Sequence, residues 1–96
     1  MEKLKDDIEK LAMISKALSH PVRLYILKNL AKSNSCCYSG DIAKELNLSA
    51  STLSPHFKEL KNAGLIQSHK ELPYIKYCIN RENFEMAKKL YSDLFN

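Results

Sequence analysis

The sequence predicts a mainly helical α+β fold, with about five helices and a small wing of two or three β-strands. Apolar residues recur at helical spacing through most of the 96 residues. In the middle of the chain only the tripeptide NLS separates two such segments, and two runs of alternating apolar and polar residues follow them. Two short helices joined by a tight turn and followed by a β-hairpin form a winged helix-turn-helix.

The composition favours one ordered domain over residues 1–96. Apolar residues make up 45% of the chain, which argues against disorder. No apolar run approaches the roughly 20 residues that cross a bilayer, and the charged start MEKLKDDIEK is unlike a signal peptide. We therefore expect a cytoplasmic protein with no membrane partner. A net charge of +4 is compatible with a polyanion partner but does not require one.

Apolar stripes predict a helix at each end of the chain. The N-terminal stripe consists of Leu4, Ile8, Leu11, Ile14 and Leu18. The C-terminal run, residues 82–95, has Phe84, Ala87, Leu90, Tyr91 and Leu94 at similar spacing. The two helices either complete the core of a monomer or pack against their copies in a twofold dimer. We favour the dimer, in which both serve as dimerisation helices, because neither belongs to the helix-turn-helix.

The segment SHPVRLYILKNLAK predicts a second helix. Ser19 is the expected N-cap, with Pro21 in the first turn. Its expected buried residues are Val22, Tyr25, Ile26, Leu27 and Leu30.

The helix-turn-helix is expected at residues 39–46 and 50–63. In the first helix Ile42, Ala43 and Leu46 face inward. The second, which we term the reading helix, begins after a Ser49 cap and ends before Gly64. Its inward stripe is Leu53, Phe57 and Leu60.

The outer face of the reading helix begins with small hydroxyl residues and ends with lysines. This pattern suits a helix in the major groove of DNA, because small residues admit the backbone to the base edges while hydroxyls and lysines bond to bases and phosphates. A plain surface helix is the alternative. Pro55 lacks an N–H and is expected to loosen the preceding turn, and His56 either touches DNA or packs at the flank. The candidate DNA contacts in this helix are Ser51, Thr52, Ser54, His56, Lys58 and Lys61.

The runs LIQSHKE and YIKYCIN, separated by Leu72-Pro73, predict the hairpin of the wing. In the second run, Ile75, Tyr77 and Ile79 share one face. Three basic residues, His69, Lys70 and Lys76, are expected to hold the DNA backbone that passes the wing.

The chain resembles the ArsR/SmtB family of small winged-helix repressors over nearly its whole length, in the segments ALSHPVRLYILKNL, SGDIAKELNLSASTLSPHFKELKNAGLI and YIKYCIN. The resemblance implies a homodimer that binds double-stranded operator DNA and leaves it when an inducer occupies a sensory site. In that family the inducer is often a metal or metalloid ion, and sometimes a sulfur or redox signal.

The inducer depends on three cysteines, Cys36, Cys37 and Cys78. An odd number of cysteines in a cytosolic-looking chain argues against disulfides, so we expect free thiols or thiolate ligands. The first two fall where winged helices often have a short strand, and the third lies in the strand that would pair with it. All three are candidate ligands for a soft ion, namely As(III), Sb(III), Cd(II) or Cu(I), and no obligatory cofactor is expected.

The cysteines depart from the pattern of the family. Many arsenic-responsive members of the family carry a Cys-x-Cys pair, whose matching positions here are Cys37 and Ser39, so one expected thiol is missing. Adjacent strand residues point to opposite faces, so Cys36 and Cys37 share an ion only if the backbone bends. Three alternatives remain open: a buried Cys78 with only one reactive thiol in the pair Cys36 and Cys37, a cysteine-oxidation switch, and the absence of any inducer. The zinc sites of the family are disfavoured because the last helix has no histidine.

Two other classes of function are disfavoured. An enzyme is not expected, because there is no glycine-rich phosphate loop or nucleophile elbow and the chain has only two glycines. A winged helix that binds only protein would lack the hydroxyl and basic groups of the outer face.

Overall fold

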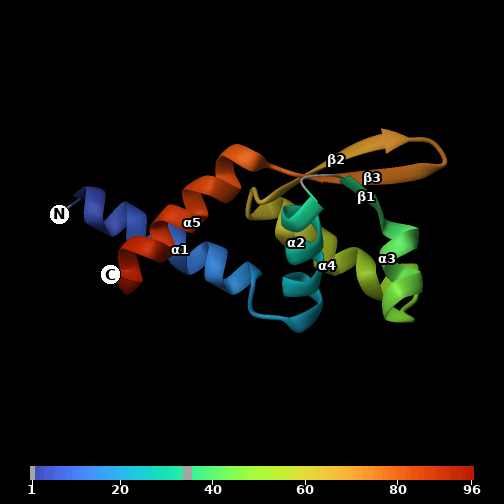
Figure 1. The fold of residues 1–96 in the computed structure, drawn as a ribbon, viewed down its shortest axis with the longest axis horizontal. Helices are drawn as coiled ribbons and strands as arrows, with labels where there is room; N and C mark the ends of the chain where they lie inside the picture. Colours follow the sequence, from blue (N-terminus) through green and yellow to red (C-terminus); the bar gives the residue numbers. More distant parts are fainter. Residues whose placement is uncertain (1, 34–35) are drawn as a thin grey trace.

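The structure is a computed structural model that describes the backbone of residues 2–33 and 36–96 and the side chains of residues 6–32 and 36–96. Leu4 of the predicted N-terminal stripe lies outside the described side chains. The chain forms five helices and three strands in these ranges, which confirms the predicted winged helix-turn-helix (Figure 1). In chain order they are α1 (Glu2–Ala17), α2 (Pro21–Ser33), β1 (Cys36–Tyr38), α3 (Ser39–Leu46), α4 (Ala50–Asn62), β2 (Ile66–Glu71), β3 (Tyr74–Ile79) and α5 (Arg81–Phe95).

The strands form an antiparallel sheet in the order β1-β3-β2. The hairpin of β2 and β3 is the predicted wing, and its register places His69 opposite Lys76. The short strand β1 pairs with the other edge of β3 and runs directly into α3. The short strand β1 therefore connects the sheet of the wing to the start of the helix-turn-helix.

The core lies where α2 and α4 pack on the sheet. The predicted inward residues Leu53, Phe57 and Leu60 are each 0% exposed. The ring of Phe57 stacks on Tyr77 of β3 with centroids 4.1 Å apart, which fixes the reading helix against the root of the wing. Each such side chain contributes roughly 1.5–3 kcal/mol through burial. Ile75, on the same face of β3 as Tyr77, lies beyond this core and is exposed.

The turn of the helix-turn-helix relies on a left-handed residue. Asn47 follows α3 with φ 55° and ψ 45°, a conformation that asparagine tolerates better than most residues. The next N–H, of Leu48, donates to the carbonyl of Ala43. After the C-terminus of α4, Gly64 has φ 80°, a conformation that glycine adopts readily and that suits the predicted end of the helix before this residue.

Two expectations for α2 are wrong. The residue before the helix is His20, not Ser19, and its Nδ1 accepts a hydrogen bond from the N–H of Val22. The hydroxyl of Ser19 instead donates to the carbonyl of Lys16 in α1. Tyr25, expected in the core, is exposed, and its hydroxyl donates to Glu45 of α3.

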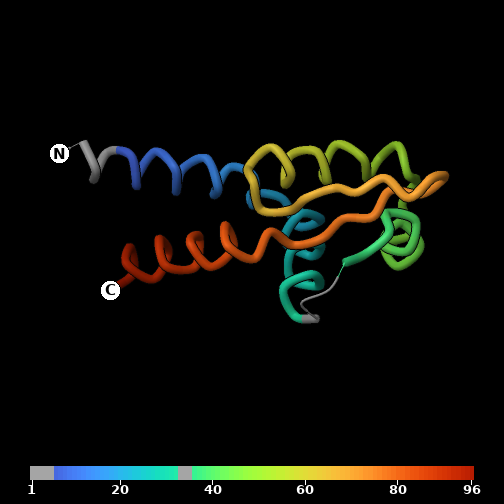
Figure 2. Tube along the Cα trace, turned by 90° about the horizontal axis from the view of Figure 1, so that it is seen from above, coloured from blue at the N-terminus to red at the C-terminus, as the bar shows by residue number. Residues whose placement is uncertain are grey.

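The terminal helices lie side by side and project from the body of the molecule (Figure 2). Their packing includes a hydrogen bond of 2.6 Å between the hydroxyls of Ser15 and Tyr91. Ile14 and Ala87 belong to the core, whereas apolar side chains nearer the free ends of the two helices are exposed. In the described part of the chain, no helix has the length and apolar character needed to cross a membrane.

Candidate nucleic-acid interface and cysteine site

The start of the reading helix is a cluster of hydroxyls. The Oγ of Ser49 accepts a hydrogen bond of 3.1 Å from the N–H of Thr52, which confirms it as the N-cap. The same oxygen lies 2.8 Å from the Oγ1 of Thr52 and 3.1 Å from the Oγ of Ser51. Two of the hydroxyls predicted to face DNA, those of Ser51 and Thr52, are therefore exposed but already organised by the cap.

The outer face of α4 has the predicted orientation. Its exposed candidate contacts are Ser51, Thr52, Ser54, Lys58 and Lys61. Pro55 is the sixth residue of the helix, past the first turn, so the Ser51 carbonyl receives no N–H from the residue four positions later. The hydroxyls thus lie on a turn with one fewer helical hydrogen bond.

His56 sits at the flank of the helix. Its Nδ1 accepts a hydrogen bond of 3.2 Å from the Nε of Arg23, and its ring lies 4.3 Å from the ring of His20. Desolvation, and then the nearby His20 and Arg23, lower the pKa of His56. Arg23 was missed by the sequence reasoning, because only the folded chain brings it next to a residue 33 positions away.

The wing offers less free positive charge than the sequence suggests. His69 and Lys70 are exposed, but the Nζ of Lys76 lies 3.3 Å from the Oε1 of Glu71. Glu71 also accepts a hydrogen bond of 2.5 Å from the hydroxyl of Tyr38, and these two bonds lower its pKa. Glu71 therefore offsets part of the charge that Lys76 was expected to present to a phosphate.

The cysteines contradict the expectation of three free thiols. Cys36 and Cys78 oppose each other in the β1–β3 ladder, with Cα atoms 4.1 Å apart, and form a disulfide. Cys37 is free and packs against the core on the other face of the sheet. Burial, and then the Asp41 and Glu45 carboxylates, raise the pKa of its thiol to about 11.

This arrangement does not assemble a three-thiolate site. Two of the predicted ligands are bonded to each other, and the third points away from them. Among the described residues, no group of three or more His, Cys, Asp or Glu side chains is placed to hold a metal ion.

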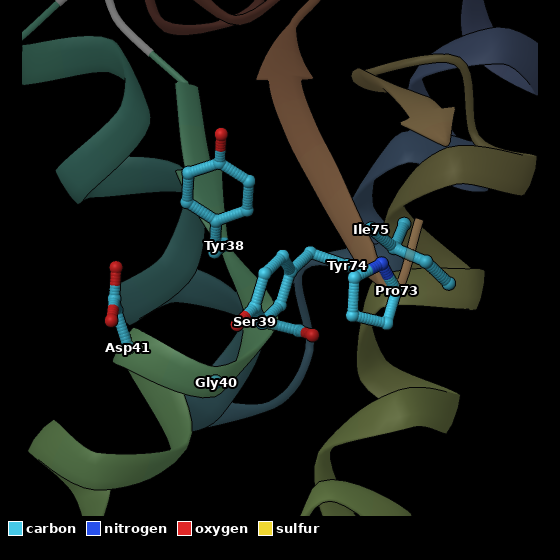
Figure 3. A pocket seen from close by; sticks show the side chains of 7 residues that line it. All are labelled: Tyr38, Ser39, Gly40, Asp41, Pro73, Tyr74 and Ile75. Carbon is cyan, nitrogen blue, oxygen red and sulfur yellow. The ribbon is translucent and has the colours of Figure 1, made fainter. Parts of the chain in front are cut away.

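An open groove of about 640 Å³ separates the start of α3 from the turn of the wing. Figure 3 shows Tyr38 and Asp41 on one side, Pro73 and Ile75 on the other, and the ring of Tyr74 between them. The Tyr38 and Tyr74 rings meet edge to face with centroids 6.0 Å apart. The groove could not be predicted from the sequence, because its two walls, residues 38–41 and 73–75, are distant in the chain.

Comparison with known proteins relates the chain to a family of regulators. The family model described as "Bacterial regulatory protein, arsR family" matches residues 20–68, just over half of the chain. A curated relative, the uncharacterised HTH-type transcriptional regulator MJ1325 of Methanocaldococcus jannaschii, is 38% identical over 90% of this chain and 96% of its own length.

Two solved structures are similar over most of the chain. Reduced HlyU from Vibrio cholerae superposes with a TM-score of 0.77 at 27% identity, covering 96% of both chains. The homodimeric winged helix-turn-helix DNA-binding domain of Mb0332 from Mycobacterium bovis has a TM-score of 0.70 at 26% identity, covering 91% of this chain and 76% of that one.

Proposed function

The chain belongs to the ArsR family of regulatory proteins, and we propose that it is a dimeric repressor that binds double-stranded operator DNA through α4 and the wing. The observation that carries this proposal is the division of α4 into two faces. Its apolar face is wholly buried, and its opposite face presents hydroxyls at the start and Lys58 and Lys61 later. Exposed hydroxyls and lysines on a rigidly packed helix suit direct contact with bases and phosphates.

The terminal helices support a dimer. Ile8, in the first half of α1, is 59% exposed, and Leu94 and Phe95, the last two residues of α5, are 59% and 80% exposed. A second copy packed on this surface would remove apolar area from water. The similar Mb0332 domain is described as homodimeric. A twofold dimer would carry its two reading helices to successive major grooves about 34 Å apart, so the operator would be an inverted repeat.

The pair Cys36 and Cys78 is the sensory site in this proposal. β1 ends where α3 begins, so a bond that draws Cys36 onto β3 acts on the strand entering the helix-turn-helix. Hydrogen peroxide would oxidise the two thiols to the disulfide and be reduced to two water molecules. The oxidised geometry would then fit the operator less well, and DNA would be released.

A soft ion held by the two reduced thiolates is the second candidate inducer. The direct opposition of Cys36 and Cys78 favours it, because both sulfur atoms can reach one ion from the same face of the sheet. Arsenite and cadmium would compete with the oxidant for the same two atoms. The two candidates therefore differ in chemistry but share a site.

Anisotropy titrations of DNA from upstream of the protein's own gene test two parts of the proposal: operator binding, and sensing by Cys36 and Cys78. The reduced protein should bind, and peroxide, arsenite or cadmium should release it. Cys36→Ser and Cys78→Ser should bind but no longer respond, whereas Cys37→Ser should respond as the wild type does. Failure of the reduced protein to bind any upstream fragment would overturn the repressor assignment. Release that survives in Cys36→Ser and Cys78→Ser would move the sensory site elsewhere.

A further inference from the structure

Arg23 of α2 connects the end of α1 to the reading helix. Its Nη1 donates to the carbonyls of Ala17 and Lys16, at 3.3 and 3.4 Å, in the last turn of α1. Its Nε donates to the Nδ1 of His56 in α4, at 3.2 Å. One planar side chain thus bonds to two helices while its backbone belongs to a third.

The chemistry of this contact calls for arginine. The carbonyls at the C-terminus of a helix carry partial negative charge and lack helical donors, so a cation with several N–H groups suits them. The guanidinium presents donors in fixed directions and can bond to both α1 and His56, whereas the ammonium of a lysine cannot reproduce this fork.

The contact with Arg23 also determines the protonation state of the His56 imidazole. An imidazole nitrogen that accepts a hydrogen bond carries no proton, so His56 must be neutral, with its proton on Nε2. With Nδ1 occupied, the Nε2–H of His56 is left as a donor, suited to a phosphate oxygen or a base acceptor.

We propose that Arg23 is a positioning residue for DNA recognition: it holds α4 against the end of α1, sets the distance between the two reading helices of the dimer, and presents the Nε2–H of His56 on the reading helix. This inference rests on the proposed function. It predicts that loss of the Arg23 contact loosens the spacing requirement of the operator, since α1 is a dimerisation helix and α4 carries the base contacts.

The inference is tested by measuring the affinity for two kinds of operator. One has the natural spacing between half-sites, and the other has one or two base pairs inserted between them. Arg23→Gln should weaken binding to the natural spacing on the order of tenfold and reduce the penalty for the inserted spacings, with dimer dissociation unchanged in sedimentation. Arg23→Lys should behave like Arg23→Gln. Lys28→Gln, which removes one positive charge from an exposed position of the same helix, should keep the wild-type spacing penalty. An unchanged penalty in Arg23→Gln, or full function in Arg23→Lys, would overturn the inference.

Two measurements remain informative if the wild type binds no DNA, and the wild-type spectrum in the first of them does not depend on how well Arg23→Gln folds. Nitrogen-15 spectra of the imidazole rings should show His56 protonated at Nε2 in the wild type and a tautomer mixture in Arg23→Gln. Urea unfolding of His56→Gln, Arg23→Gln and the double variant should show that the two effects do not add. Failure of the wild type to bind DNA would reject the proposed function, whereas strictly additive effects with an unchanged tautomer would reject the Arg23 contact itself.

Discussion

Cys36 and Cys78 face each other across the β1–β3 ladder and are joined by a disulfide, while Cys37, one position along the same strand, packs toward the core on the opposite face. Because successive side chains of β1 point to opposite faces of the sheet, the bonded pair lies on one face and the protected thiol of Cys37 on the other. The chemistry of the three cysteines should differ accordingly.

Reduction of the disulfide should destabilise the protein. The bond closes a loop between residues separated by 42 positions. On the chain-entropy model, a loop of this size stabilises the fold by up to about 4 kcal/mol. Urea unfolding of the oxidised wild type with and without a phosphine reductant measures the difference. Cys36→Ser should unfold at the same urea concentration in both conditions, and a wild type insensitive to the reductant would contradict the prediction.

Cys37 should react slowly with alkylating agents in the folded state. A thiol pKa of about 11, raised from 9.0 chiefly by burial, leaves about 100-fold less thiolate at pH 8 than the unshifted group has. Iodoacetamide labelling of the oxidised protein, followed by mass spectrometry, gives the rate, and the urea-unfolded protein is the control. The rate at which iodoacetamide labels Cys37 in the folded protein should rise as the pH approaches 11. Equal rates in the folded and unfolded protein would show that Cys37 is not protected.

Periodicity located the helices well because burial of one face is a local property of the sequence. The stripe of Leu53, Phe57 and Leu60 placed α4 correctly, and the turn residues Asn47 and Gly64 have the backbone conformations that end helices. The pairing of Cys36 with Cys78 depends on strand register, which brings together residues far apart in the chain.

The polar contacts were the least predictable part of the candidate site. Glu71, which offsets the charge of Lys76, and Arg23, which bonds to His56, each meet a partner on another element. The sequence pattern placed Lys76 on the wing as a DNA contact, and left His56 either touching DNA or packing at the flank, without these partners. The prediction of the α2 cap was wrong for a similar reason. Ser19 and His20 both have side chains able to cap a helix, and only the folded backbone determines which of them does so.

His56 should make stability depend on pH below neutrality. Its pKa is lowered in the folded state, so the unfolded chain binds the proton more readily. Its stabilising contribution is therefore complete above the ordinary value of 6.5 and is lost as the pH falls through the lower folded value. Urea unfolding between pH 5 and 7.5 should show a smaller decline for His56→Gln than for the wild type. Lys58→Gln should keep the wild-type decline, and identical slopes for all three proteins would exclude His56 as the cause.

A charge on the exposed ends of the terminal helices should break the dimer. Phe95 is 80% exposed in one chain, and a glutamate at its position would place a carboxylate in the proposed apolar interface. Phe95→Glu should raise the dimer dissociation constant at least about tenfold in sedimentation equilibrium. Leu72→Glu, at a position 86% exposed on the wing, is the matched control and should leave the constant unchanged. Equal dissociation constants for both variants would place the interface elsewhere.

Replacement of Pro55 by alanine should stabilise the reading helix. Alanine restores the N–H that the Ser51 carbonyl lacks and has the highest helix propensity, so the free energy of unfolding should rise by roughly 1–3 kcal/mol. Ser54→Ala, at the exposed neighbouring position, separates this effect from a general gain in helix propensity. If Pro55→Ala gains no more stability than Ser54→Ala, the helix already accommodates the proline at no cost.

If Pro55→Ala does gain more stability, operator affinity shows whether the looser first turn helps the Ser51 and Thr52 hydroxyls to contact DNA. A more stable helix that binds more weakly would show that this turn must adjust on binding.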